Sequence, residues 1–404
     1  MDGRPRLVLL HYAAWPVVGG VESVMAAQAR LLSAAGYEVR VVAGRGDAEL
    51  VPEVDSRHPR VEQVTRRLAA GDPAQPEFDA LRRLLGERLR PLLAGCHRVI
   101  AHNILTMPQN LPLAAALVDA GHPILAWTHD LAWVNPRYVD YRRPGWPWSI
   151  LHEAQPGVRY VAISRERRRQ LASVMSGLRP GRIPVIPNGI DPEDFWGIAP
   201  RTRALALRAG LEGADPLILV PVRITPRKRL ELALEAAARL RPAYPRLRLV
   251  VSGPLGPHAA ENLAYAAELS ELRRRLHLEQ AVRFLYELAG QEAQHPVDDA
   301  MIADLYRMAD VVLLPSESEG FGLPVLEAAL SRAPLVCADL PVLREAAGAG
   351  AWTFPAGAGP EAVAAAVRRA LGSRMARLRR RVLGRYRWST VLASMQRVIG
   401  ADLG

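Results

Sequence analysis

The most informative part of the sequence is the stretch Pro315-Ser316-Glu317-Ser318-Glu319-Gly320-Phe321-Gly322-Leu323-Pro324-Val325-Leu326-Glu327. It follows an unbroken apolar run, Val311 to Leu314, which predicts a strand buried on both faces, as in a parallel sheet. From Leu323 to Leu330 the apolar residues have helical spacing, and Pro324 suits the first turn of a helix. The stretch therefore predicts a parallel strand, a glycine turn and a helix whose free N–H groups face the crevice where open α/β sheets bind ligands.

Two carboxylates accompany this turn: Glu319 lies in the turn itself, and Glu327 lies eight positions later on the expected helix. A charged carboxylate this close to a buried strand needs a partner. Sugar and ribose hydroxyls are suitable partners, because each donates a hydrogen bond to an ionised acceptor. The alternative is a structural strand-turn-helix with two solvated glutamates.

The thirteen-residue string resembles the donor-binding motif of family 4 of the retaining glycosyltransferases, which includes many bacterial hexosyltransferases. The resemblance implies that Glu319 faces the donor hexose and that Glu327 holds the ribose of the nucleotide. It also implies that the backbone amides of Phe321, Gly322 and Leu323 meet the hexose hydroxyls and the phosphate.

Composition sets the broad class of the protein. A chain of 404 residues, half of them hydrophobic, suits two globular domains of about 200 residues each. No apolar stretch reaches the roughly 18 residues of a membrane span, and Met1 to Arg6 leads directly into a strand, so we expect neither a membrane helix nor a signal peptide. Cys96 and Cys337 predict buried thiols in a reducing compartment, the cytoplasm.

The net charge of +11 leaves three kinds of partner open: nucleic acid, an anionic membrane surface, or an acidic small substrate. No nucleic-acid motif accompanies the basic residues, whereas a peripheral contact at the inner membrane face stays open. Lys228 is the only lysine among the 52 basic residues, and every other one is arginine. A compact ammonium at that position approaches a phosphate as a point charge, unlike a planar guanidinium, although a chance leftover is the alternative.

The first part of the chain predicts a βαβ unit: a strand at Arg6–His11, the pair Gly19-Gly20, a helix over Val21–Ala35 and a strand at Glu38–Ala43. A Gly-x-Gly-x-x-Gly fingerprint is absent, which argues against an ordinary dinucleotide-binding dehydrogenase. By itself the glycine pair predicts a tight turn as readily as a functional role; the resemblance implies that Gly19 and Gly20 let backbone approach the donor phosphate or the acceptor. Residues 44–75 give no clear pattern, and the further elements expected are helices near 77–93 and 109–120 and strands at Arg98–Ala101, Ile124–Thr128, Tyr160–Ile163 and Ile183–Ile186.

A histidine and an aromatic-rich loop follow the strand Ile124–Thr128. His129 lies at its carboxyl end, where the resembled family places a histidine beside the donor hexose, so we favour a functional role for it. The role of Asp130 is open. The loop that follows holds Trp133, Tyr138, Tyr141, Trp146 and Trp148, which predict either a stacking pocket for the acceptor or rings that pack the loop onto the domain.

The second half begins after a turn-rich linker, Pro187 to Pro192. Arg223 and Lys228 follow the strand expected at Leu217–Val222, in the spacing Arg-x-x-x-x-Lys. The resemblance implies that they neutralise the donor diphosphate, and the alternative is solvated surface charge. With two cations there, no divalent metal and no other cofactor is expected; Asp-x-Asp is absent, and Asp298-Asp299 is expected in a loop.

The rest of the second half completes this picture. Gly253 ends a strand at Leu247–Val251 and resembles the family's glycine near the phosphates. A strand is expected at Val282–Leu285, and the long loop Tyr286–Asp299 departs from the family pattern, which leaves the donor base open. A further strand is expected at 335–337, and Trp388–Ile399 resembles the family's last helix, which packs back on the first domain.

We therefore predict an α/β protein of the GT-B class, with two Rossmann-like doubly wound domains facing across a cleft. Residues 1–190, with a terminal helix from about 388 to 404, form the acceptor-side domain, and residues 191–387 form the donor domain. The expected function is metal-independent, retaining transfer of a hexose from a GDP-mannose or UDP-glucose type of donor to a hydroxyl of a lipid, polysaccharide or small polyol. The alternatives are a nucleotide-sugar epimerase or phosphorylase on the same fold, and a non-catalytic basic surface-binding protein. The oligomeric state stays open.

Overall fold

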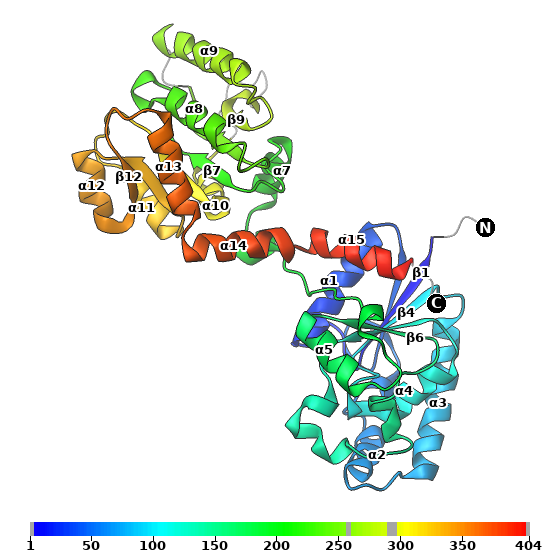
Figure 1. Cartoon of the computed structure of the whole chain (residues 1–404). Helices are drawn as coiled ribbons and strands as arrows, with labels where there is room; N and C mark the ends of the chain where they lie inside the picture. The colour runs from blue at the N-terminus through cyan, green and yellow to red at the C-terminus, as the bar shows by residue number, and fades with distance from the viewer. Residues whose placement is uncertain (1–3, 256–259, 289–296, 401–404) are drawn as a thin grey trace. The chain divides into compact units, whose positions relative to one another are not determined.

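The computed structural model describes residues 4–255, 260–288 and 297–400 (Figure 1). The chain divides into two compact units. The first comprises Met1–Ile190 together with Tyr386–Gly404, and the second comprises Asp191–Arg385. Each unit contains one six-stranded sheet in which every described strand pair is parallel.

The first sheet has the strand order β3-β2-β1-β4-β5-β6, the doubly wound order in which the chain adds β2 and β3 on one side of β1 and then returns to add β4, β5 and β6 on the other. Its strands are β1 (Arg6–Leu10), β2 (Glu38–Ala43), β3 (Glu49–Leu50), β4 (Arg98–His102), β5 (Ile124–Thr128) and β6 (Val158–Ala162). Its α-helices are α1 (Gly20–Ala34), α2 (Pro59–Ala69), α3 (Gln75–Leu93), α4 (Leu111–Asp119), α5 (Arg165–Val174) and, from the end of the chain, α15 (Trp388–Ile399).

Helices cover both faces of this sheet, as the side-chain alternation of β1 shows. Leu7 and Leu9 join one apolar cluster with residues of α1 and α15, whereas Val8 and Leu10 join another with residues of α2, α3 and α4. Because both faces are buried, the strand has no polar alternation, which is why it appears in the sequence as a continuous apolar run. The arrangement leaves only the strand ends free to carry polar, functional side chains.

The second sheet repeats the same topology, with the order β12-β11-β10-β7-β8-β9. Its strands are β7 (Leu217–Val220), β8 (Arg248–Val251), β9 (Val282–Phe284), β10 (Val311–Leu314), β11 (Leu335–Ala338) and β12 (Trp352–Phe354). Its α-helices are α6 (Pro192–Trp196), α7 (Pro200–Arg208), α8 (Leu230–Leu240), α9 (Ala260–Arg275), α10 (Asp299–Met308), α11 (Leu323–Leu330), α12 (Pro341–Ala347), α13 (Pro360–Leu371) and α14 (Arg374–Arg385). One large apolar cluster runs through both faces of the sheet. The predicted class, two Rossmann-like doubly wound domains of the GT-B type, is confirmed.

Two expectations about secondary structure are wrong. Ile183–Ile186 is not a strand; it meets β6 at one isolated bridge between Ala162 and Val185, because the prolines at 184 and 187 lack the N–H groups that a ladder needs. Asp299 does not lie in a loop but begins α10, and Asp298 directly before it caps that helix by accepting a hydrogen bond from the amide of Met301 at 2.9 Å.

The expectation that both thiols are buried is correct for Cys337 and wrong for Cys96, which is only partly buried. Neither cysteine forms a disulfide bond. The segment 44–75, which gave no pattern, contains β3 and α2. Of the expected loop Tyr286–Asp299, residues 289–296 lie outside the described residues. Among the described helices, none is long and apolar enough to cross a membrane.

Candidate functional site

The polar residues of the second unit gather where its strand order reverses. β7 and β10 are neighbours in the sheet and run parallel, with Val312 opposite Leu219. Their carboxyl ends therefore meet at the same edge, the place where open α/β sheets bind ligands. The segment after β7 carries Arg223 and Lys228, and the segment after β10 carries Glu319.

Lys228 and Glu319 form a buried ion pair at this edge. The distance from Lys228 Nζ to Glu319 Oε1 is 2.5 Å, and each side chain is only 9% exposed. Arg227 ties the two segments together: its carbonyl accepts from the amide of Glu317 at 2.9 Å, and its guanidinium donates to the carbonyl of Ser318 at 3.2 Å. Two residues separated by 91 positions in the sequence are thus held in direct contact.

Gly253 brings a third segment to the same place. A Cβ at this position would lie 2.1 Å from the carbonyl oxygen of Val222 and 2.7 Å from the amide nitrogen of Arg223. No side chain fits there, so glycine is required for the loop after β8 to touch the loop after β7. The neighbouring amide of Ile224 donates to the carbonyl of Pro254 at 2.9 Å, which fixes this contact. Arg223 itself is exposed to solvent.

The turn into α11 has the conformation that its glycines predict. Gly322 has φ +88°, in the left-handed region, and a Cβ there would lie 2.8 Å from Leu343 Cδ2. The flanking Phe321 and Leu323 are 62% and 59% exposed, so this end of the helix is open to solvent. Glu327, on the same helix, accepts a hydrogen bond of 2.6 Å from the hydroxyl of Tyr306.

The contributions of Tyr306 and Arg227 were not predicted from the sequence. Tyr306 is buried on α10, and a hydrogen bond to a carboxylate from another helix leaves no mark in the local pattern. Arg227 lies directly beside Lys228, so its position in the loop was the available signal.

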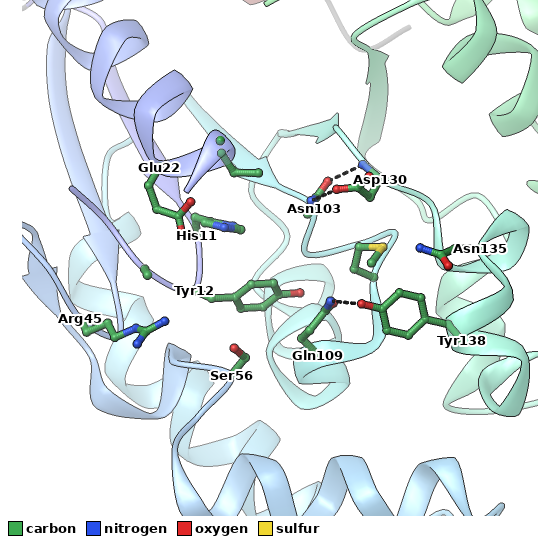
Figure 2. Close-up of a pocket in the computed structure, with 14 residues that line it drawn as sticks. His11, Tyr12, Glu22, Arg45, Ser56, Asn103, Gln109, Asp130, Asn135 and Tyr138 are labelled. Carbon is green, nitrogen blue, oxygen red and sulfur yellow. Dashed lines mark hydrogen bonds between the residues drawn. The ribbon is translucent and has the colours of Figure 1, made fainter. Parts of the chain in front are cut away.

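The first unit also gathers polar residues where its strand order reverses, between β1 and β4. A pocket of about 390 Å³ opens there, and Figure 2 shows its lining. The lining comes from the start of α1 and from the segments after all of the strands β1 to β5. It includes His11, Tyr12, Gly20, Glu22, Arg45, Ser56, Asn103, Gln109, Asp130, Asn135 and Tyr138.

A line of three histidines lies buried beside this pocket. His102 Nδ1 is 3.0 Å from His129 Nε2, and their rings are stacked with centroids 5.3 Å apart. His11 Nδ1 is 2.9 Å from the carbonyl oxygen of His102. Burial is the main cause that lowers the pKa of His129 to about 4, with the charges of His11 and Arg167 adding to it. Burial also lowers the pKa of His11 and, more strongly, of His102, so all three rings are neutral at pH 7.

Asn103 fixes the turn that carries His129. Its side-chain oxygen accepts from the backbone amides of both His129 and Asp130, each at 2.9 Å, and its amide group donates to the Asp130 carboxylate at 3.3 Å. Asn103 has φ +61°, a strained value for a residue with a side chain. The sequence analysis missed this residue, although asparagine directly after a predicted strand tolerates that conformation better than most.

The pair Gly19-Gly20 begins α1. Gly19 is the N-cap residue, and a Cβ there would lie 2.1 Å from Glu22 Oε2, so the missing side chain leaves room for that carboxylate. Gly20 lines the pocket and has open space around its Cα.

Most rings of the aromatic loop pack onto the domain. Trp146 stands edge-on to Phe78 at 5.8 Å, and the indole N–H of Trp148 donates to the carbonyl of Leu68 at 3.3 Å. Trp133 contacts His152, and the hydroxyl of Tyr141 donates to the carbonyl of Thr65. Tyr138 is the loop aromatic that lines the pocket. Packing is therefore the better of the two interpretations for the tryptophans.

Comparison with known proteins identifies the family. The family described as "Glycosyltransferase Family 4" matches residues 18–194, and the one described as "Glycosyl transferases group 1" matches residues 207–386. A protein named D-inositol 3-phosphate glycosyltransferase from Frankia alni is 31% identical over 344 residues, which cover 81% of this chain and 79% of that protein. Another of that name from Kineococcus radiotolerans is 38% identical over 202 residues, covering 48% of this chain and 43% of that protein.

Several of these relatives match the chain over about half of their own length. Among solved structures, sucrose-phosphate synthase from Thermosynechococcus elongatus is 16% identical, with 98% of each chain covered and a TM-score of 0.38. The two doubly wound sheets define an α/β protein of the GT-B class. The chain belongs to the glycosyltransferase family that these two descriptions cover, Glycosyltransferase Family 4 in its first half and Glycosyl transferases group 1 in its second.

Proposed function

We propose that the protein is a retaining glycosyltransferase that moves a hexose from a nucleotide-sugar donor to a hydroxyl acceptor without a divalent metal ion. The observation that carries this proposal is the direct contact between Lys228 and Glu319 at the strand-order reversal of the second sheet, with Arg223 on the same loop as Lys228. A cation that would hold a diphosphate and a carboxylate that would hold sugar hydroxyls are in direct contact there.

The two cations suit a diphosphate leaving group. When the bond between the sugar carbon C1 and the phosphate oxygen breaks, the electron pair and negative charge remain on the nucleoside diphosphate. Lys228 has three N–H donors, and one of them is directed to Glu319, so others are available for phosphate oxygens. Arg223 is exposed beside the close contact at Gly253, where backbone without side chains lets a phosphate approach.

The start of α11 suits the sugar and nucleotide. Free backbone amides at Phe321, Gly322 and Leu323 lie at a helix N-terminus, which favours anions and hydroxyl oxygens. We assign the hexose hydroxyls to Glu319 and the ribose hydroxyls to Glu327, whose carboxylate is oriented by Tyr306. A carboxylate held by a tyrosine hydroxyl retains a second oxygen for a ligand.

We assign the acceptor to the pocket of the first unit and a hexose contact to the neutral His129. The acceptor oxygen bonds to C1 on the face that the diphosphate leaves, and the acceptor proton passes to the departing phosphate oxygen. The configuration at C1 is thereby retained without a covalent enzyme intermediate. The relatives are named for transfer to an inositol phosphate, and this supports a hydroxyl acceptor of the polyol or sugar class.

The test is a panel of nucleotide sugars with the full chain, first by thermal shift and then by mass spectrometry of products with sugar and polyol acceptors. We expect a nucleoside diphosphate to raise the melting temperature, and a disaccharide-type product to form in the presence of EDTA with the donor's anomeric configuration. A donor that is altered without any acceptor indicates an epimerase instead. Absence of both binding and transfer across the panel contradicts the proposal.

A further inference from the structure

The pocket of the first unit carries information about the chemistry of its occupant. Three buried polar atoms of lining residues have no hydrogen-bond partner among the described residues: the hydroxyl oxygen of Tyr12, the side-chain oxygen of Gln109 and Arg45 Nε. Arg45 Nε still lies 3.3 Å from the carboxylate of Asp55 in an ion pair, so the two oxygens are the atoms left for an occupant. Figure 2 shows the Tyr12 hydroxyl directed toward Gln109, whose amide nitrogen donates to Tyr138 at 3.1 Å. Buried polar atoms need partners, and an alcohol can satisfy both because each hydroxyl donates and accepts.

The charges around the pocket are unusual for this protein. The whole chain has a net charge of +11, yet the lining includes one arginine, Arg45, and two carboxylates, Glu22 and Asp130. Arg45 already pairs with Asp55 at 3.3 Å, and Asp130 lies 3.7 Å from Arg167. These two pairs balance within themselves, so the charge left facing the pocket is negative.

Glu22 supplies that charge: it lies in the first turn of α1, where the helix N-terminus stabilises the carboxylate without neutralising it. Within the described part of the chain its carboxylate has no ion pair, and Figure 2 shows it directed toward His11 at the edge of the pocket. His11 is neutral at pH 7, because burial lowers its pKa more than the nearby Glu22 raises it. His11 Nδ1 donates to the carbonyl oxygen of His102, so the neutral ring has no second N–H for Glu22 and places no balancing positive charge beside it.

We infer that the pocket takes a polyhydroxylated acceptor without an anionic group, and that Glu22 excludes the phosphorylated form of the same molecule. This inference rests on the proposed function, because it names the acceptor class of that reaction. Hydroxyls satisfy Glu22, Tyr12 and Gln109 together, whereas a phosphate brought beside Glu22 meets a like charge in a partly buried site. An amino group on the acceptor is compatible with the same carboxylate.

The experiment measures binding directly, so its result does not depend on glycosyl transfer. The full chain is titrated with two matched pairs of probes, inositol with D-inositol 3-phosphate and glucose with glucose 6-phosphate, and saturation-transfer NMR gives each Kd. The titrations use physiological ionic strength, because salt screens the general attraction of phosphates to a protein of charge +11. Glu22→Gln and Glu22→Arg are compared with Glu87→Gln, a change of an exposed carboxylate on α3.

We expect at least one neutral probe to bind about tenfold or more tightly than its phosphate in the wild-type protein. Glu22→Gln should narrow that difference, Glu22→Arg should reverse it, and Glu87→Gln should leave it unchanged. Tighter binding of the phosphates by the wild-type protein overturns the inference, as does binding of neither series or a preference that Glu22→Gln leaves unaltered. Nucleoside diphosphate binding is measured on the same sample; its loss counts against the proposed function, and not against the acceptor class.

Discussion

Lys228 and Glu319 allow the sharpest prediction about the second unit, because each is buried against the other. At the observed 2.5 Å the attraction between the two charges is about 7 kcal/mol in an effective dielectric of about 20, before the cost of desolvation is subtracted. Removing one partner of a buried pair leaves the other charge without compensation, which costs about 3 to 5 kcal/mol. We therefore expect Lys228→Met to lower the unfolding free energy of the second unit by about 3 to 5 kcal/mol.

The double-mutant cycle separates the pair from the single residues. Glu319→Gln should lower the unfolding free energy by less, about 2 kcal/mol, because the amide oxygen of the glutamine still accepts a hydrogen bond from Lys228. Lys228→Met with Glu319→Gln should lose less than the sum of the single changes, with a coupling of about 2 kcal/mol. Urea unfolding followed by circular dichroism gives each value.

Arg227→Met is the matched control for this cycle. Its guanidinium lies 4.0 Å from the other oxygen of Glu319 but is 56% exposed, so the change should cost below about 1 kcal/mol. If Lys228→Met lowers the unfolding free energy as little as Arg227→Met does, the buried pair does not exist in solution. The same follows if the losses caused by Lys228→Met and Glu319→Gln are additive in the double variant.

Three further predictions concern other parts of the two sites. Asn103→Ala removes the acceptor shared by the amides of His129 and Asp130, so it should lower kcat/KM for the transfer reaction about tenfold or more. The affinity for a nucleoside diphosphate, measured by calorimetry, should change little. An unchanged kcat/KM would count against a positioning role for Asn103. Because the pKa of His129 falls from 6.5 to about 4 on folding, the unfolded chain binds more protons than the folded one between those pH values. The contribution of His129 to the free energy of unfolding is therefore complete above pH 6.5 and is lost on acidification toward pH 4. Urea unfolding from pH 4 to 7 should show up to about 3 kcal/mol from this residue, and a profile of the same slope in His129→Gln would refute the assignment. Tyr306→Phe removes the 2.6 Å hydrogen bond to Glu327 and should weaken nucleoside diphosphate binding several-fold, while kcat at saturating donor is maintained. An unchanged affinity by calorimetry would contradict the assignment of the ribose hydroxyls to Glu327.

The fold was predictable because both sheets are buried on two faces. Val311–Leu314 is a fully buried apolar run, and its bounds in the structure agree with the prediction. The bounds of Glu38–Ala43 agree as well, although this strand is only partly buried and is recognised by its valines. Trp388–Ile399 and Leu323–Leu330 also agree as helices, since their apolar spacing is regular. The segment Ile183–Ile186 has the same composition as a strand, but the prolines that flank it limit pairing to one residue.

The site residues were predictable as positions and not as contacts. Glycines with unusual geometry, such as Gly253 and Gly322, are visible in the sequence because their neighbours form a recognisable turn. The pairing of Lys228 with Glu319 is not visible, because 91 residues separate them and each alone resembles an available ligand. The histidine line was not predicted for the same reason. His11 and His129 follow β1 and β5, His102 ends β4, and only the sheet order brings these three strand ends together.

The central claim is that the second unit holds a nucleotide-sugar diphosphate with protein cations. The most direct measurement is calorimetric titration of UDP and GDP into the wild-type protein and into Arg223→Ala, both in EDTA. Arg223 is exposed, so its removal should leave the melting temperature of the unliganded protein unchanged. We predict binding of at least one nucleotide by the wild-type protein and at least about tenfold weaker binding by the variant. Binding that requires a divalent metal, or equal affinity in the two proteins, would contradict the claim.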